Sequence, residues 1–203
     1  MPEAGRVITG DAGGLRLEAP GGGTRPLSDK VKQALFSMLE SAHRDTWSGN
    51  ALDLFAGSGA AGIESLSRGA LRALFVEREG RAARVISANL DRTHLSDRGR
   101  IVRGDVLPWL AAGVATVAEA PFRVVIVDPP YAQVADLASS LERLGDVELA
   151  WLEPSAIVVA KHFWKDAPRD RAGSLERLRL RRFGETALSV YRQDPHLAAG
   201  GSP

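Results

Sequence analysis

The sequence contains no cysteine, so disulfide bonds and thiolate catalysis are excluded, and this absence fits a reducing compartment. Histidine is scarce as well, and the histidines lack the spacing that is typical of metal ligands. We therefore expect no bound metal. The histidines lie at His43, His94, His162 and His196.

The chain also lacks long apolar runs and a strong net charge. No run reaches the roughly 20 residues that a membrane-spanning helix requires, and the first residues lack the apolar core of a secretory signal. We expect a cytoplasmic protein with no membrane partner. The net charge of +1 excludes a polycation that binds free nucleic acid without specificity.

Length and composition predict one main domain. Hydrophobic residues make up 44% of the 203 positions, which is sufficient for the core of an ordinary domain. We expect residues 27–193 to form that domain, with a β-hairpin extension at 1–26 and a disordered tail at 194–203. We expect the protein to be a monomer.

Strand-like and helix-like segments alternate along the middle of the chain. This alternation predicts an α/β fold with a parallel sheet that is covered by helices on both faces. Two further strand-like segments near the C-terminus, joined by a turn at 183–186, predict an antiparallel pair at the end of the sheet. The alternating strands are expected at 51–56, 71–77, 100–105, 122–128 and 155–162, and the helices at 28–42, 60–69, 81–92 and 135–145.

A glycine-rich loop follows the first strand of this alternation. Gly57, Gly59 and Gly62 form the pattern G-x-G-x-x-G, which lets the backbone approach an adenosine-containing ligand. Glu77 ends the next strand, where a carboxylate can accept hydrogen bonds from ribose hydroxyls. These features predict an adenosine cofactor, and they are shared by NAD and S-adenosylmethionine.

Asp53 distinguishes between these two candidate cofactors and favours S-adenosylmethionine. A carboxylate in a buried strand is costly unless a cation lies near it, and S-adenosylmethionine carries both an ammonium and a sulfonium. Asp105 ends the strand that follows Glu77, where an adenine edge would lie. Because the carboxyl ends of parallel strands meet at one edge of a sheet, the three acids predict an S-adenosylmethionine site there.

The segment DPPY, Asp128–Tyr131, closes the strand expected at 122–128. The exocyclic amine of a nucleobase is a poor nucleophile because its lone pair is delocalised, and two acceptors for its N–H bonds would orient it. The carboxylate of Asp128 and the carbonyl of Pro129, whose direction two prolines restrict, form such a pair. Tyr131 offers a stacking face, which is typically worth about 1–3 kcal/mol per base. The segment therefore predicts methyl transfer to an amine.

Together, the segments DLFAGSG and DPPY resemble the amino-directed class I S-adenosylmethionine-dependent methyltransferases. The block Thr24–Leu39 and the segment Ile8–Leu17 narrow this resemblance to the bacterial 16S rRNA (guanine-N2)-methyltransferase family of the RsmD type. The resemblance implies a Rossmann-like sheet of seven mostly parallel strands. It further implies methylation of a flipped guanine in 16S rRNA, within an assembled small-subunit particle.

The same resemblance implies roles for individual residues. The target amine would be held by Asp128, Pro129, Pro130 and Tyr131. The cofactor would be bound by Asp53, Phe55, Gly57, Ser58, Gly59, Glu77, Asp105 and Val106. The N-terminal hairpin and the turn after it would contact RNA through Arg6, Arg16, Arg25, Ser28, Asp29 and Lys32.

Two positions depart from the pattern of that family. Its fifth strand often ends in a glutamate, whereas this chain has Ala160 and Lys161. Leu15 follows Gly14 where an arginine is common. We expect both differences to affect RNA contacts more than the chemistry.

The segment Arg169–Arg182 concentrates positive charge, with six arginines and two acids. Leucine and arginine alternate at 177–181, which predicts a strand with leucines on one face and arginines on the other. Two interpretations remain for this strand. It is either a phosphate-contacting face or a solvated edge strand whose charges discourage aggregation.

Several other functions compete with the guanine-N2 hypothesis. An adenine-N6 methyltransferase acting on DNA or RNA would use the same acceptor geometry. A ribosome-assembly factor that binds RNA without catalysis is disfavoured by the intact Asp128–Tyr131 segment. A protein-glutamine methyltransferase usually has asparagine at the position of Asp128, and Asp53 disfavours an NAD-dependent dehydrogenase.

Overall fold

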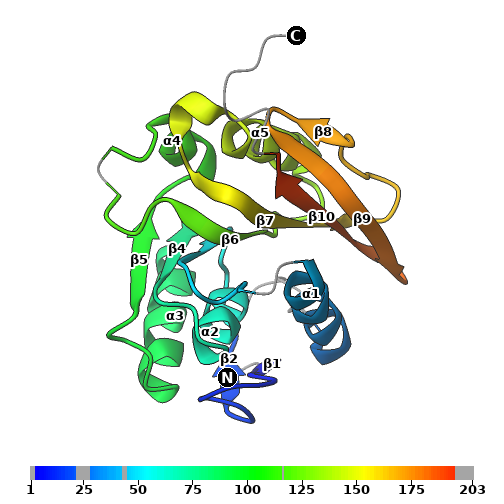
Figure 1. The fold of residues 1–203 in the computed structure, drawn as a ribbon. Helices are drawn as coiled ribbons and strands as arrows, with labels where there is room; N and C mark the ends of the chain where they lie inside the picture. Colours follow the sequence, from blue (N-terminus) through cyan, green and yellow to red (C-terminus); the bar gives the residue numbers. More distant parts are fainter. Residues whose placement is uncertain (1–2, 22–27, 43–44, 116, 195–203) are drawn as a thin grey trace, which may run out of the picture.

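The computed structural model describes residues 3–21, 28–42, 45–115 and 117–194 (Figure 1). Its main feature is a sheet with the strand order β5-β4-β3-β6-β7-β10-β9-β8. The strands are β3 (Ala51–Leu54), β4 (Ala73–Glu77), β5 (Gly99–Arg103), β6 (Phe122–Val127), β7 (Leu152–Phe163), β8 (Arg171–Ala172), β9 (Leu175–Phe183) and β10 (Thr186–Gln193).

The first five strands of this order are parallel, and the last three are not. Strand β3 pairs in parallel with β4 and β6, and the parallel set continues to β5 on one side and to β7 on the other. Strand β10 is antiparallel to both β7 and β9. The predicted α/β class with an antiparallel C-terminal pair is confirmed. The sheet has eight strands instead of seven, because the two-residue strand β8 pairs with the start of β9.

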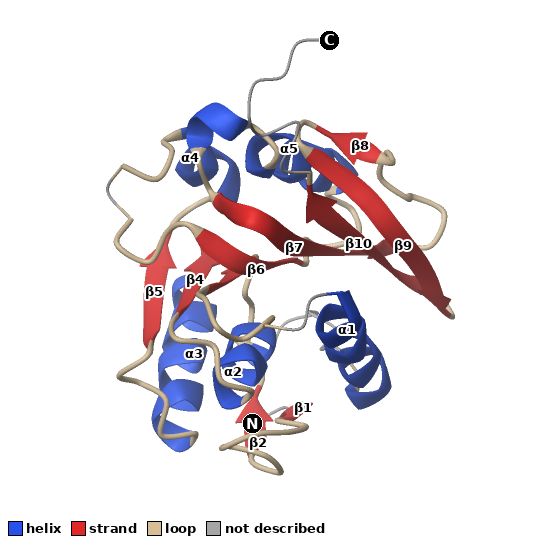
Figure 2. Ribbon diagram, in the orientation of Figure 1, coloured by secondary structure: helices blue, strands red, loops and turns tan. Residues whose placement is uncertain are grey.

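Helices cover both faces of the sheet (Figure 2). One face carries α1 (Asp29–Ala42), α2 (Ala60–Ser67) and α3 (Gly80–Arg92), and the other carries α4 (Val106–Ala111) and α5 (Val134–Leu144). A 3₁₀ turn, η1 (Val147–Leu149), follows α5. The central strands therefore lie between two apolar layers, which explains why β3, β4 and β6 are almost continuously hydrophobic.

A small hairpin formed by β1 (Glu3–Arg6) and β2 (Arg16–Glu18) packs beneath α2 and α3 (Figure 1). The carboxylate of Glu64 in α2 fastens it, accepting hydrogen bonds from the backbone N–H groups of Ile8 at 2.7 Å and Thr9 at 3.1 Å. Asn89 of α3 donates from its side-chain amide to the carbonyl of Glu18 at 2.9 Å. The expected hairpin is thus present and fixed to the main domain.

Three further expectations concern the C-terminal tail, membrane spans and metal sites. The tail at 194–203 lies outside the described residues from position 195 onward. Within the described ranges, no helix has the length and apolar character needed to cross a membrane. The same residues contain no cluster of three or more side chains suited to holding a metal ion.

Candidate active site

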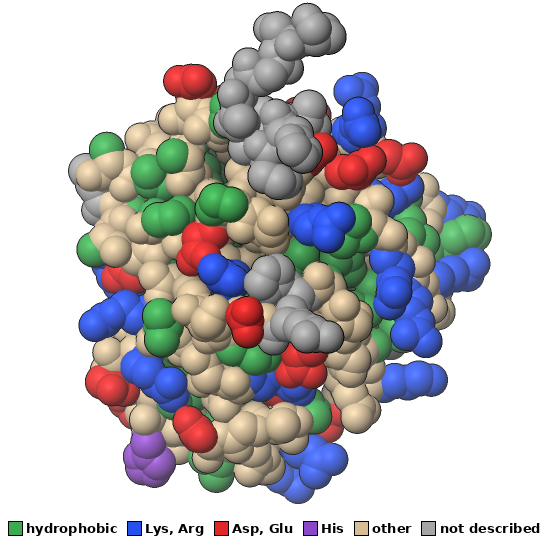
Figure 3. Space-filling model, in the orientation of Figure 1, with side chains coloured by type: hydrophobic (Ala, Val, Ile, Leu, Met, Phe, Trp, Pro, Cys, Tyr) green, Lys and Arg blue, Asp and Glu red, His purple; other side chains and the backbone are tan. Residues whose placement is uncertain are grey.

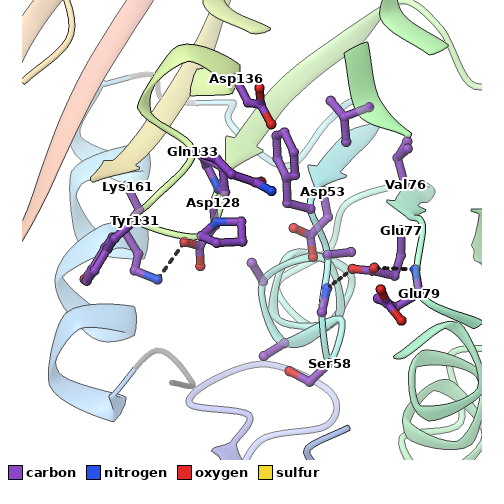
Figure 4. Close-up of a pocket in the computed structure, with 18 of the residues that line it drawn as sticks. Asp53, Ser58, Val76, Glu77, Glu79, Asp128, Tyr131, Gln133, Asp136 and Lys161 are labelled. Atoms are coloured by element: carbon purple, nitrogen blue, oxygen red, sulfur yellow. Dashed lines mark hydrogen bonds and ion pairs between the residues drawn. The ribbon is translucent and has the colours of Figure 1, made fainter. Parts of the chain in front are cut away.

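A cavity of about 940 Å³ opens at the carboxyl ends of the central strands (Figure 4). The loops after β3, β4, β5 and β6 all contribute to its wall, as does the start of the β10 strand. Open α/β sheets bind ligands at this edge, in the crevice where the strand order reverses, which here lies between β3 and β6. The four predicted acids Asp53, Glu77, Asp105 and Asp128 all line the cavity, together with Lys161.

The glycine loop joins β3 to α2 through backbone conformations that favour glycine. Gly57 has φ 56° and Gly59 has φ 75°, and Gly59 immediately precedes the first residue of α2. Gly62 serves packing instead, since a Cβ atom there would lie 2.2 Å from Cε1 of the buried ring of Phe75. The loop thus forms a tight turn, and α2 lies close against β4.

Glu77 at the end of β4 holds the glycine loop in place. Its side chain is buried, and its Oε2 accepts a hydrogen bond from the N–H of Gly57 at 2.8 Å. Its Oε1 accepts a second hydrogen bond from the N–H of Glu79, also at 2.8 Å (Figure 4). A carboxylate has about four acceptor sites, so acceptor capacity remains for the hydroxyls of a ribose.

Asp53 lies within β3 and is 2% exposed. Its Oδ2 accepts a hydrogen bond from the N–H of Gly62 at 2.8 Å, in the first turn of α2. Burial raises the pKa of Asp53 well above its ordinary value, the Gly62 hydrogen bond opposes this rise, and the carboxylates of Asp128 and Glu77 add to it. The carboxylate therefore caps a helix and also makes the cavity favourable for a cation.

The other residues predicted to bind the cofactor lie around the same loop. Phe55 has an unusual positive φ of 59° for a residue with a side chain, and Ser58 lines the cavity. The carbonyl of Ser58 accepts a hydrogen bond from Asn89 Nδ2 at 2.9 Å, which ties the loop to α3. Asp105 precedes the first residue of α4 with an exposed carboxylate, and the buried Val106 begins that helix.

Asp128 follows β6 directly, and its carboxylate is paired with a cation from the neighbouring strand. The Nζ atom of Lys161 in β7 lies 2.6 Å from its Oδ1 (Figure 4). Burial raises the pKa of Asp128, and the Lys161 ammonium opposes that rise through its charge and its hydrogen bond. Lys161 therefore favours the ionised carboxylate in a setting that would otherwise favour the protonated form.

The rest of the DPPY segment forms a turn at the cavity wall. The carbonyl of Pro130 accepts a hydrogen bond from the N–H of Gln133 at 2.8 Å, which fixes the turn. The hydroxyl of Tyr131 lies 2.6 Å from Oγ1 of Thr186 in β10, and the residue is 37% exposed. The Lys161 ammonium also lies 5.3 Å from the centre of this ring. The segment thus presents a carboxylate, a restrained backbone and an accessible aromatic face to one cavity.

Lys161 is the site residue whose role the sequence reading missed. In the sequence, Lys161 stands out only as a departure from a family pattern. The signal lay in the register of two parallel strands, because Val127 of β6 lies opposite Ala160 of β7. The residues that follow them, Asp128 and Lys161, are therefore neighbours.

The residues predicted to contact RNA lie in different settings in the structure. Arg6 is exposed and pairs with Asp29 at 3.4 Å, and Arg16 pairs with Glu3 at 2.6 Å. Ser28 lines the cavity. Arg25 lies outside the described residues.

Lys32 is placed differently from the prediction. Its side chain is fully buried, and its ammonium donates to the backbone carbonyl of Arg6. Burial lowers the pKa of Lys32, and the carboxylates of Glu64 and Asp29 partly oppose this. Lys32 therefore holds the N-terminal hairpin against α1, and this position argues against a direct RNA contact.

Comparison with known proteins identifies relatives along nearly the whole chain. The family described as Conserved hypothetical protein 95 matches residues 5–192. The chain is 35% identical over 189 residues to the putative rRNA methyltransferase YlbH of Bacillus subtilis, covering 93% of this chain and 98% of that protein. It is 32% identical over 194 residues to ribosomal RNA small subunit methyltransferase D of Escherichia coli K12, covering 93% and 90% of the two chains.

Solved structures that are similar to this chain are also described as methyltransferases or methylases. The putative methyltransferase yhhF from Escherichia coli superposes with a TM-score of 0.78 at 28% sequence identity, covering 93% of this chain and 97% of that one. A putative methylase from Haemophilus influenzae gives a TM-score of 0.74 at 27% identity, with 95% and 99% covered. The class I methyltransferase fold expected from the sequence is therefore confirmed.

Proposed function

This chain belongs to the family described as Conserved hypothetical protein 95, the RsmD-type methyltransferases, and we propose that it methylates the N2 amine of a guanine in 16S rRNA with S-adenosylmethionine as the methyl donor. One observation carries this proposal. The cavity brings a glycine loop and the buried Asp53 and Glu77 together with the DPPY segment. It therefore combines a surface suited to a cationic adenosine cofactor with acceptors suited to an amine.

The cofactor half of the cavity fits S-adenosylmethionine in charge and in shape. Asp53, Glu77 and Asp128 are close enough that the carboxylates of the last two raise the pKa of the first. A bound cation relieves this repulsion. S-adenosylmethionine supplies an electrophilic methyl group on a sulfonium when it is bound. Glu77 keeps acceptor sites for a ribose while it holds Gly57.

The amine half of the cavity orients the base. Oδ1 of Asp128 is engaged by Lys161, so we assign Oδ2 of Asp128 to one N–H of the target amine. The Pro130 carbonyl is engaged by Gln133, so we assign the carbonyl of Pro129 to the other N–H. Two directional acceptors hold the nitrogen towards the methyl group, and positioning of this kind can supply roughly 7–11 kcal/mol of the barrier.

Tyr131 provides the stacking face for a flipped guanine. Its hydroxyl contact with Thr186 fixes the ring at the mouth of the cavity, and its exposed fraction leaves room for a base. Flipping costs a few kcal/mol of lost stacking, which the cavity must recover through contacts to the base. We propose that the substrate is an assembled small-subunit particle, which presents the guanine in a fixed shape, and that the enzyme acts as a monomer.

The test is to identify the methylated nucleoside. The purified protein would be incubated with S-adenosylmethionine labelled in the methyl group and with small ribosomal subunits from a strain that lacks the related methyltransferase. The rRNA would then be digested to nucleosides. We expect label in N2-methylguanosine. Label in N6-methyladenosine would replace guanine with adenine as the target, and absence of label despite cofactor binding would contradict an enzymatic role.

A calorimetric titration tests the cofactor separately. We expect S-adenosylmethionine to bind and NAD not to bind, because the buried Asp53 carboxylate favours a cationic ligand. Binding of NAD alone would overturn the cofactor assignment. Asp128→Ala serves as the control for chemistry, since it removes the proposed amine acceptor and leaves the glycine loop and Glu77 in place.

A further inference from the structure

The outer part of strand β9 is exposed on both faces. Leu178 and Leu180 are 42% and 43% exposed, and the arginines that alternate with them are exposed as well. The alternation of leucine and arginine in this part of the strand therefore buries neither set of side chains. Strand β8 pairs only with Leu175 and Glu176, so β9 is the edge of the sheet from there to its end, within the described chain.

Among the described residues, salt bridges neutralise the arginines near the start of β9 but not those near its end. Arg171 pairs with Glu176 at 3.1 Å, and Arg177 pairs with Asp170. Further along, none of the exposed arginines takes part in a salt bridge with another residue that the structure describes. We call this part of the strand the β9 arm, and its arginines are Arg179, Arg181 and Arg182.

Aromatic rings support two of these arginines. The guanidinium of Arg182 lies 3.6 Å from the centre of the Trp164 ring, and its Nε donates to the carbonyl of Gly184 at 2.8 Å. The guanidinium of Arg181 lies 5.6 Å from the centre of the Phe183 ring. Such contacts restrict a guanidinium without cancelling its charge. The arm therefore presents oriented cations to the solvent.

The arm begins at the mouth of the active-site cavity. Phe183, Gly184 and Thr186, at the turn between β9 and β10, line the cavity. Thr186 also contacts the hydroxyl of Tyr131, the proposed platform for the target base. In Figure 3 blue side chains gather along the right-hand margin, where Figure 1 places the outer part of β9. A nucleic-acid strand with one base in the cavity would therefore pass close to the arm.

We propose that the β9 arm binds the phosphates of the rRNA strand next to the target nucleotide. The charge of the arm is complementary to a phosphate backbone, and its position is continuous with the cavity. Arg179 and Arg181 are two residues apart on one face of a strand, a separation of about 7 Å, so the two side chains can reach successive groups along a chain. This inference rests on the proposed function, because it requires RNA as the substrate.

The test is the salt dependence of RNA binding by an Arg179→Gln/Arg181→Gln variant. Arg182 is kept because its contact with Trp164 can support the fold. Dissociation constants would be measured for small ribosomal subunits over a range of salt concentrations. Each phosphate contact contributes about 0.7 to 0.9 to the slope of log K against log salt. We expect the slope of the variant to be smaller in magnitude by about 1.4 to 1.8, with unchanged affinity for S-adenosylmethionine.

A matched control uses two other exposed arginines. Arg72 precedes β4 and Arg192 lies near the end of β10, so both are at the sheet edge opposite the cavity. We expect Arg72→Gln/Arg192→Gln to keep the slope of the wild-type protein. An unchanged slope in the Arg179→Gln/Arg181→Gln variant, or an equal loss in the control, would overturn the proposal.

The outcome is separable from that of the proposed function. A wild-type protein that methylates guanine, with a variant that keeps the full slope, would refute only the role of the arm. A wild-type protein that transfers no methyl group, with a variant that has the reduced slope, would refute the enzymatic role and support the arm as an RNA contact.

Discussion

Replacing Lys161 with methionine removes the ammonium that lies 2.6 Å from Oδ1 of Asp128 and keeps an unbranched side chain. Lys161 of β7 and Asp53 of β3 are the charged groups near Asp128, and Glu77 of β4 lies near Asp53 in turn. Without Lys161, only carboxylates would remain in this set. The variant should therefore disfavour the ionised form of Asp128 in the folded protein.

The size of the effect follows from the geometry of the pair. At 2.6 Å and an effective dielectric constant of about 20, the gross Coulomb attraction is about 6 kcal/mol. Desolvation offsets part of it, since the two side chains are only 11% and 21% exposed. Removing one partner of a buried pair costs about 3–5 kcal/mol. The residual exposure of Asp128 places the expected loss near the lower end, about 3 kcal/mol with Asp128 ionised.

The loss should depend on pH in a defined direction. Burial raises the pKa of Asp128 in the folded state, so its contribution to stability is fully present below the pKa of the unfolded chain and is lost as pH rises through the folded pKa. Removing Lys161 raises the folded pKa further. The variant should therefore be destabilised more at about pH 8 than at about pH 5, where Asp128 gains a proton more readily.

Urea unfolding at both pH values would measure this difference, and methyl transfer would be followed across the same range. We expect the acid side of the activity profile to move to higher pH in Lys161→Met, because the ionised Asp128 is the proposed amine acceptor. Lys165→Met is the matched control, since Lys165 is exposed and contacts the ring of Trp164 instead. Equal destabilisation of Lys161→Met at the two pH values, with an unmoved activity profile, would refute the reasoning.

Three other substitutions separate stability from function. In Asp53→Asn the amide oxygen can still accept a hydrogen bond from the N–H of Gly62. Because the folded pKa of Asp53 is raised, the wild-type protein loses stability as pH rises, so thermal unfolding should show the variant becoming more stable relative to the wild type at higher pH. Calorimetry should show weaker binding of S-adenosylmethionine to the variant. Equal pH dependence in both proteins would contradict this. Gly62→Ala should destabilise by about 1–3 kcal/mol in urea unfolding, because the new Cβ would overlap the Phe75 ring; unchanged stability would contradict the close packing of α2 on β4. Asp128→Asn should lower methyl transfer by about 10²-fold or more, as measured with labelled cofactor, and keep cofactor affinity within a few fold. Retained activity would remove Asp128 from its proposed role.

The fold could be predicted because the sequence patterns that indicate it are either periodic along a strand or helix or confined to a short segment. The parallel strands are apolar runs separated by helical patterns, and the glycine loop between β3 and α2 has a fixed spacing. Strand β8 has two residues, Arg171 and Ala172, which is too short for any period to show. Its existence depends on pairing with β9, which is a tertiary contact.

The site was predictable to the extent that topology determines it. Asp53, Glu77 and Asp128 each follow from their place at the carboxyl end of a parallel strand, where the sheet order brings them together. Lys161 required the register between β6 and β7, which the sequence alone does not fix. For Lys32 the sequence suggests an exposed position, since a lysine in a helix is expected to face solvent, but the side chain is buried. Its ammonium donates to the backbone carbonyl of Arg6 in the hairpin, a tertiary contact that the sequence pattern does not reveal.

The two halves of the cavity differ in how far they are formed before a ligand binds. On the cofactor side, Glu77 and Asp53 already hold the glycine loop and the first turn of α2 through backbone N–H groups. On the amine side, Lys161 occupies one oxygen of Asp128 and lies 5.3 Å from the centre of the Tyr131 ring. An entering base must therefore fit beside this ammonium or displace it from the ring. Because a phosphate bound at the β9 arm would bring the base to this point, RNA contacts outside the cavity can offset the cost of rearranging Lys161 inside it.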